Sequence, residues 1–79
     1  MVKKMKEISL QGIAPKNAIQ VNEVKAGDVM ICNFGYTQKI VNLTPSKSGK
    51  TYNVIIECNG KLYDCKMSAT RYIALARLN

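Results

Sequence analysis

The dipeptide Asn59-Gly60 constrains the fold of this chain more than any other feature, because it determines how two strands pair. Asn-Gly between two apolar-rich runs predicts a two-residue hairpin, since both residues tolerate the positive φ of a type I′ turn. Cys58 then faces Lys61, and the pairing continues outward along both strands. One predicted face is apolar and consists of Tyr52, Val54, Ile56, Tyr63, Cys65 and Met67. This alternation at period two predicts a ribbon that packs on a core through that face.

The rest of the chain is also typical of a β-protein, with turn signals at intervals of about 8 to 12 residues. The further strand-like segments are residues 7–13, a short run around Ile19 and Val21, and residues 29–32, 37–44 and 72–78. The last of these segments contains good helix formers, but its shortness and its Tyr-Ile start favour a closing strand. We expect an all-β fold of five to six short antiparallel strands that close into a small barrel.

Length and charge limit the domain organisation and the kind of partner. The 79 residues predict a single domain, 1–79, with a barrel core at 23–78 and a disordered segment at 1–6. Twelve Lys and Arg against five Asp and Glu give a formal charge of +7, which favours a polyanionic partner. Nucleic acid and an acidic protein surface both satisfy that requirement.

Cellular location is predicted from what the sequence lacks. No apolar segment of signal-peptide type follows the basic N-terminus, and no run approaches the ~20 apolar residues that cross a bilayer. Three cysteines, without a CxxC motif and without histidine, indicate neither a disulfide framework nor a metal site. We expect a cytoplasmic protein with reduced, half-buried thiols and no membrane association.

Catalytic chemistry has few candidate groups in this chain. There is no histidine to act as a base, the five carboxylates are scattered, and the cysteines lie in apolar strands that would raise their pKa. Residues 44–51 end in Gly-Lys-Thr like a phosphate-binding P-loop, but they begin with Thr44 instead of glycine and precede a strand instead of a helix. We therefore expect no enzyme activity, no cofactor and no metal.

Aromatic and basic residues supply the candidate binding residues. Phe34 and Tyr36 flank Gly35 at a predicted tip, with Lys39 beyond them, a combination that suits base stacking beside a phosphate contact. The competing interpretation is that Phe34 or Tyr36 folds down to cap one end of the barrel. The predicted set of nucleic-acid or partner-binding residues is Phe34, Tyr36, Lys39, Lys47, Lys50 and Arg71.

From Glu23 to Leu78 the order of signals resembles small SH3-like barrels of the KOW and Tudor type, with an OB-like barrel as the alternative. The resemblance rests on the segment from Val24 through Gly27-Asp28 to Val29, and on Tyr63 followed by the segment from Thr70 to Ala74. The chain also looks like small open reading frames of phages and mobile elements in Gram-positive bacteria. That second likeness suggests an origin and transfers no functional residue.

Three functions are compatible with these observations. The first is a nucleic-acid-binding module that uses the basic and aromatic residues. The second is a phage-type protein-interaction or inhibitor module that binds an acidic host protein through the tip or an edge strand. The third is a structural protein whose β-edges pair into a homo-oligomer, an oligomeric state that the sequence leaves open.

Overall fold

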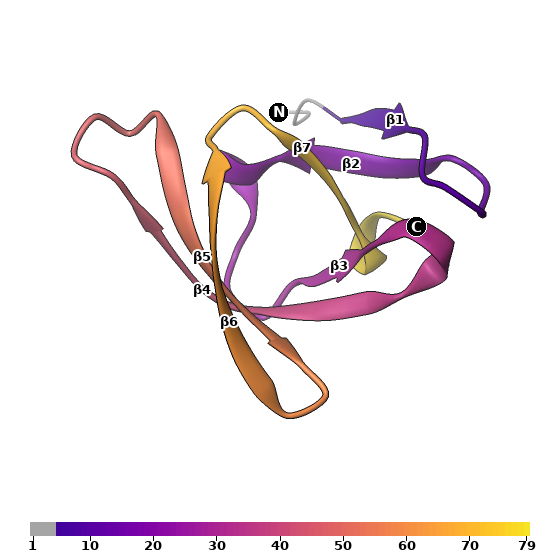
Figure 1. Ribbon diagram of the computed structural model, residues 1–79. Helices are drawn as coiled ribbons and strands as arrows, with labels where there is room; N and C mark the ends of the chain where they lie inside the picture. The colour runs from indigo at the N-terminus through magenta and orange to yellow at the C-terminus, as the bar shows by residue number, and fades with distance from the viewer. Residues whose placement is uncertain (1–4) are drawn as a thin grey trace.

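The computed structural model describes residues 5–79, in which seven strands form one antiparallel sheet (Figure 1). The strands are β1 (Lys6–Ile8), β2 (Lys16–Gln20), β3 (Val29–Ile31), β4 (Thr37–Pro45), β5 (Thr51–Cys58), β6 (Lys61–Ser68) and β7 (Tyr72–Leu75). Three 3₁₀ turns join them or follow them: η1 (Val21–Glu23), η2 (Asn33–Gly35) and η3 (Ala76–Leu78). The strand order across the sheet is β1-β2-β7-β3-β4-β5-β6.

The predicted all-β antiparallel class is confirmed. The number of strands exceeds the expected five to six, because every strand-like segment of the sequence forms a strand, including the segment before Gly12, which forms the short β1 and pairs with β2. Lys6 therefore belongs to the sheet instead of a disordered segment, and residues 1–4 of that predicted segment lie outside the described residues. The assignment to SH3-like instead of OB-like barrels stays a prediction.

The hairpin of β5 and β6 has the predicted register at every position. Cys58 pairs with Lys61, and the pairing continues without interruption to Thr51 and Ser68. Asn59 and Gly60 have φ values of 54° and 78°, as a type I′ turn requires. The turn chemistry alone was therefore sufficient to align the two strands.

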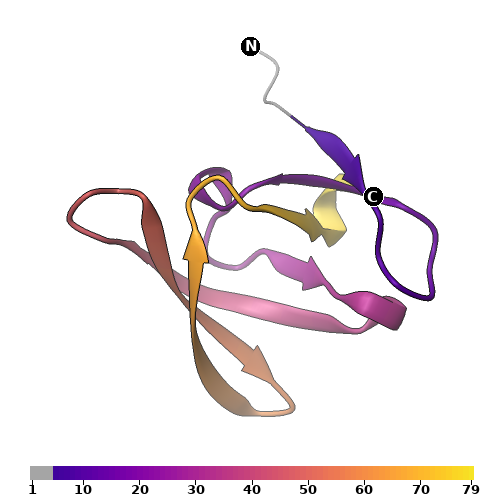
Figure 2. The ribbon, with the colours of Figure 1, turned by 45° about the horizontal axis from the view of Figure 1, so that its top comes forward.

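A bulge in β4 lets the sheet enclose a core. Ile40 pairs with Ile56, but the next pair joins Asn42 to Ile55, so that Val41 is the extra residue. Figures 1 and 2 show the sheet bent on itself, with β2 and β7 facing the long β4, β5 and β6 hairpins. The largest fully buried side chains come from both halves of the sheet and from η1: Ile19, Val21, Ile40, Val54 and Leu75.

Tyr63 departs from the predicted buried face of the hairpin. Val54, Ile56 and Met67 are buried and Tyr52 and Cys65 half-buried, whereas Tyr63 is 51% exposed. The turn of this hairpin projects beyond the rest of the sheet (Figure 1), and the apolar face is exposed to solvent at Tyr63. The alternation of apolar and polar residues predicts on which face of the strand a side chain lies, whereas its burial also depends on whether another part of the protein packs against that face.

The closing strand is shorter than predicted. β7 ends at Leu75, and the residues that were expected to continue it form η3. The Asn79 side-chain amide donates a hydrogen bond to the carbonyl of Leu75 at 2.9 Å, and Arg77 turns back to bind Asp28. These polar contacts favour a tight turn over two more residues of strand.

No helix between residues 5 and 79 has the length and apolar character required to cross a membrane.

Candidate binding surface

The turn η2 presents two exposed aromatic side chains. Phe34 is 60% exposed and Tyr36 is 71% exposed, so the interpretation that either residue caps the barrel core is wrong. The Phe34 N–H donates to the carbonyl of Gln11 at 2.7 Å, and the Gln11 N–H donates to Oδ1 of Asn33 at 2.9 Å. These two hydrogen bonds connect η2 to the loop between β1 and β2, and they fix the backbone that carries the aromatic residues.

The backbone of Phe34 is left-handed, with φ 63° and ψ 15°. This conformation costs a residue with a Cβ about 1 to 2 kcal/mol, and bulky residues rarely adopt it. The Phe34 ring lies against Gly12, where an added Cβ would overlap the ring. An exposed aromatic residue in a strained backbone is a feature that clusters at functional positions.

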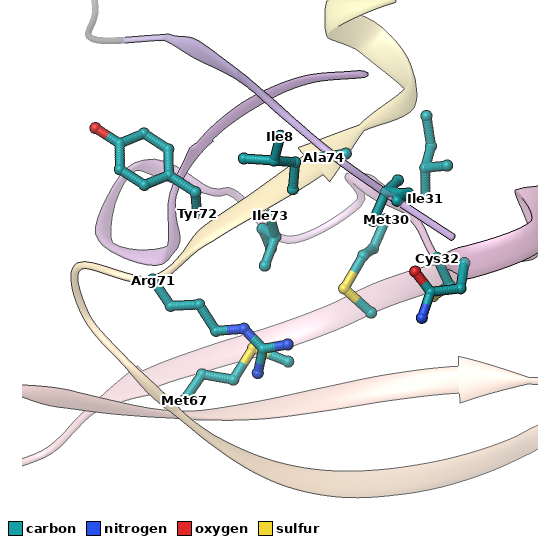
Figure 3. A pocket seen from close by; sticks show the side chains of 11 residues that line it. Ile8, Met30, Ile31, Cys32, Met67, Arg71, Tyr72, Ile73 and Ala74 are labelled. Carbon is teal, nitrogen blue, oxygen red and sulfur yellow. The ribbon is translucent and has the colours of Figure 1, made fainter. Parts of the chain in front are cut away.

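A pocket of about 190 Å³ lies where β3 and β7 diverge. These strands pair only at Met30 with Leu75 and at Ile31 with Ala74, and beyond those pairs they separate. The lining is mainly apolar and includes Met30, Met67 and Ile73, with Asn33 of η2 at one side. Figure 3 shows Arg71 extending from the start of β7 over Met67 toward the interior of this pocket.

Arg71 brings an uncompensated charge to the pocket. Among residues 5–79 the only ion pair within 4.0 Å joins Arg77 and Asp28, so Arg71 has no acidic partner there. Tyr72, the residue that follows Arg71, also lines the pocket, and the Lys6 ammonium lies 4.5 Å from its ring centroid. We call Phe34, Tyr36, Arg71, Tyr72 and Lys6, together with the pocket, the tip-pocket surface.

Lys6 and Tyr72 were not among the predicted binding residues. Lys6 pairs with Ala18, and Ala18 pairs with Ala74, so the N-terminal strand lies beside the pocket through two successive long-range pairings. No local sequence signal indicates such a placement. A basic residue near an aromatic one in space is visible only once the strand order is known.

The predicted lysines do not join this surface. Lys39 lies on the exposed face of β4 and pairs in register with Glu57 of β5. Lys47 and Lys50 lie in the loop between β4 and β5, at the far end of β4 from η2 (Figure 1). Nine residues of strand span roughly 30 Å, so the structure separates these lysines from the aromatic tip.

The loop that resembled a P-loop is a compact turn of a hairpin. The Ser46 N–H donates to the carbonyl of Thr51 at 2.9 Å, and the Gly49 N–H donates to the carbonyl of Ser46 at 3.0 Å. β5 begins at Thr51, where a P-loop would start a helix. These backbone N–H groups are used within the loop and do not form a phosphate cradle.

The three cysteines are free, and each is half-buried, which is the burial predicted for it. Burial raises the pKa of Cys32, and the nearby Cys58 raises it further, which disfavours the nucleophilic thiolate form. Cys58 and Cys65 border a second hollow of about 310 Å³ with Gln38, Ile56 and Tyr63. No group of three or more metal-ligating side chains occurs within residues 5–79.

The turn before β3 contains Asp28, whose carboxylate accepts both a backbone and a side-chain hydrogen bond. It accepts the first from the Lys25 N–H at 2.9 Å and the second from Nε of Arg77 at 2.7 Å. Burial acts to raise the pKa of Asp28, but the hydrogen bonds from Arg77 and Lys25 outweigh it and lower the pKa. This carboxylate stabilises the fold by joining the turn before β3 to η3, and it is not part of the tip-pocket surface.

Comparison with protein-family models, with curated protein sequences and with solved structures gives no match for this chain.

Proposed function

We propose that this protein binds nucleic acid with accessible bases through the tip-pocket surface. The observation that carries this proposal is the pairing of an exposed, conformationally strained Phe34 with a pocket that contains the unpaired Arg71. Aromatic side chains that stack on bases and cations that meet phosphates are the two components of single-strand recognition. The formal charge of +7 adds a long-range attraction to any polyanion.

The aromatic and the basic residues of the tip-pocket surface contact different parts of the nucleic acid. Phe34 and Tyr36 offer ring faces to bases, and each stacked base contributes about 1 to 3 kcal/mol. Arg71 offers a planar guanidinium to a phosphate, and Lys6 adds a second positive charge beside Tyr72. Recognition of this kind depends on stacking and charge and tolerates many sequences.

Fluorescence anisotropy with labelled single-stranded DNA and RNA of about 12 nucleotides tests the proposal, because single-strand sites cover roughly 4 to 16 nucleotides. We expect affinity to fall steeply with salt, and Arg71→Gln to reduce the slope of log K against log salt by about 0.7. The matched control is Lys47→Gln with Lys50→Gln, which removes two charges from the distant loop and should change the slope less than Arg71→Gln does.

Two results would contradict the proposal. One is the absence of binding to either strand type at low salt, which would instead favour an acidic protein as the partner of this basic chain. The other is a larger loss of affinity in the Lys47 and Lys50 control than in Arg71→Gln, which would move the interface to the far end of β4.

A further inference from the structure

β6 is the last strand of the sheet and has a free edge. It pairs with β5 on one side, and no strand within residues 5–79 pairs with its other side. In a two-residue hairpin the pair next to the turn, here Cys58 and Lys61, is hydrogen-bonded, and hydrogen-bonded pairs alternate from there. Leu62, Asp64 and Lys66 therefore direct their backbone N–H and C=O groups outward. The free edge ends near Ala69, whose carbonyl accepts the Asn22 N–H at 3.0 Å.

Most side chains of this edge strand are exposed, apart from the half-buried Cys65 and the buried Met67. Leu62 is 65% exposed and Tyr63 lies beside it in the projecting part of the hairpin. Asp64 and Lys66 are exposed, and neither takes part in an ion pair within the described part of the chain. A strand that combines free backbone groups with exposed apolar residues is a site for pairing with another strand.

We propose that β6 pairs antiparallel with β6 of a second copy of this chain, with Asp64 of each copy opposite Lys66 of the partner subunit. Only residues whose backbone N–H and C=O groups point outward can form hydrogen bonds between the two β6 strands, and this requirement leaves few registers. Centring the pair on Asp64 would oppose two carboxylates, and centring it on Lys66 would oppose two ammonium groups. The register centred on Cys65 opposes unlike charges twice, so the edge is complementary to itself.

This register also accounts for the apolar side chains. Tyr63, which the monomer leaves 51% exposed, lies opposite Met67 of the partner subunit in this register. Cys65 lies opposite its own copy on the two-fold axis, in a pair without direct hydrogen bonds, where Cα atoms are about 4.5 Å apart. That separation lies within the range of a disulfide, so the native cysteine reports on the register. Asp64 and Lys66, which set this register, do not line the pocket, so changing them tests the pairing without altering the tip-pocket surface, although Met67 borders both.

Sedimentation-velocity ultracentrifugation of the full chain tests the pairing. We expect a monomer-dimer equilibrium whose Kd increases about tenfold or more in Asp64→Lys and in Lys66→Asp, since each change opposes like charges across the axis. The double variant D64K/K66D exchanges the two charges, restores complementarity and should recover dimerisation. Glu7→Lys makes the same charge change on β1 and should leave the Kd within about threefold of the unchanged protein.

Oxidation gives a second, independent measurement. Added diamide accepts two electrons and two protons from two Cys65 thiols, and the two sulfur atoms form one disulfide. We expect a covalent dimer that Cys65→Ser abolishes and that Cys58→Ser and Cys32→Ser retain. A monomer at ~500 µM, or a dimer that D64K does not weaken or that crosslinks through Cys58, would overturn the proposal. Circular dichroism of each variant confirms that the sheet is intact.

Discussion

Replacing Phe34 with asparagine separates a functional aromatic residue from a structural one. Asparagine tolerates the left-handed backbone that Phe34 adopts at φ 63°, so the substitution removes strain of about 1 to 2 kcal/mol. Full burial of a phenylalanine contributes about 1.5 to 3 kcal/mol, but this ring is 60% exposed, so its loss costs roughly 1 kcal/mol. The two effects nearly cancel, and we expect the free energy of unfolding to change by less than about 1 kcal/mol.

The same substitution should weaken single-strand binding by about 1 to 3 kcal/mol, or roughly 5- to 150-fold, because a stacking surface is lost. Urea unfolding followed by circular dichroism measures the first quantity, and anisotropy at constant salt measures the second. Ile40→Ala is the stability control, since Ile40 is fully buried. Destabilisation of Phe34→Asn by about 3 kcal/mol or more would refute the reasoning, because that is the loss expected when a core aromatic residue is truncated.

Four further substitutions have outcomes that the structure predicts. Ile40→Ala should lower the free energy of unfolding by about 2 to 5 kcal/mol in urea titrations, because it opens a cavity in the core. Gly12→Ala should destabilise the protein by about 1 to 2 kcal/mol and also weaken binding, since φ is +79° there and the new Cβ would displace the Phe34 ring. Gly60→Ala should cost about 1 to 2 kcal/mol at φ +78°, measured by the shift in melting temperature. Because the folded state lowers the pKa of Asp28 below 3.8, its stabilising effect is present above that pH and is lost as the pH falls through the folded-state pKa. Arg77→Met should therefore flatten the acid limb of a stability-against-pH curve below about pH 4.

Local chemistry accounts for the parts of the fold that the sequence predicts well. Asn59-Gly60 determines both the turn type and the pairing of β5 with β6, and no distant residue takes part in that choice. Asp28 also makes a local contact, because its hydrogen bond from the Lys25 N–H spans only three residues. Its second partner, Arg77, lies 49 residues away and leaves no local signal.

The candidate site was harder to predict because it depends on where strands separate. Arg71 and Asn33 line one pocket only because β3 and β7 pair over two positions and then diverge. The sequence identified Phe34, Tyr36 and Arg71 as binding candidates because they are aromatic or basic. Lys47 and Lys50 were selected for the same reason, but they lie at the far end of β4. Residue type selects candidates, and the three-dimensional arrangement of the strands decides which of them share a surface.

The bulge at Val41 also determines where this chain tolerates changes in length. Deleting one residue from β4 would remove the offset that places both Ile40 and Leu43 on the inner face, and one end of the strand would turn its apolar side chains to water. The loop between β4 and β5 carries no such constraint, because it is exposed and its length does not set the register of the core. A fluorescent or affinity peptide inserted between Ser46 and Lys50 would thus leave the sheet intact and stand at the end of β4 that is remote from Phe34.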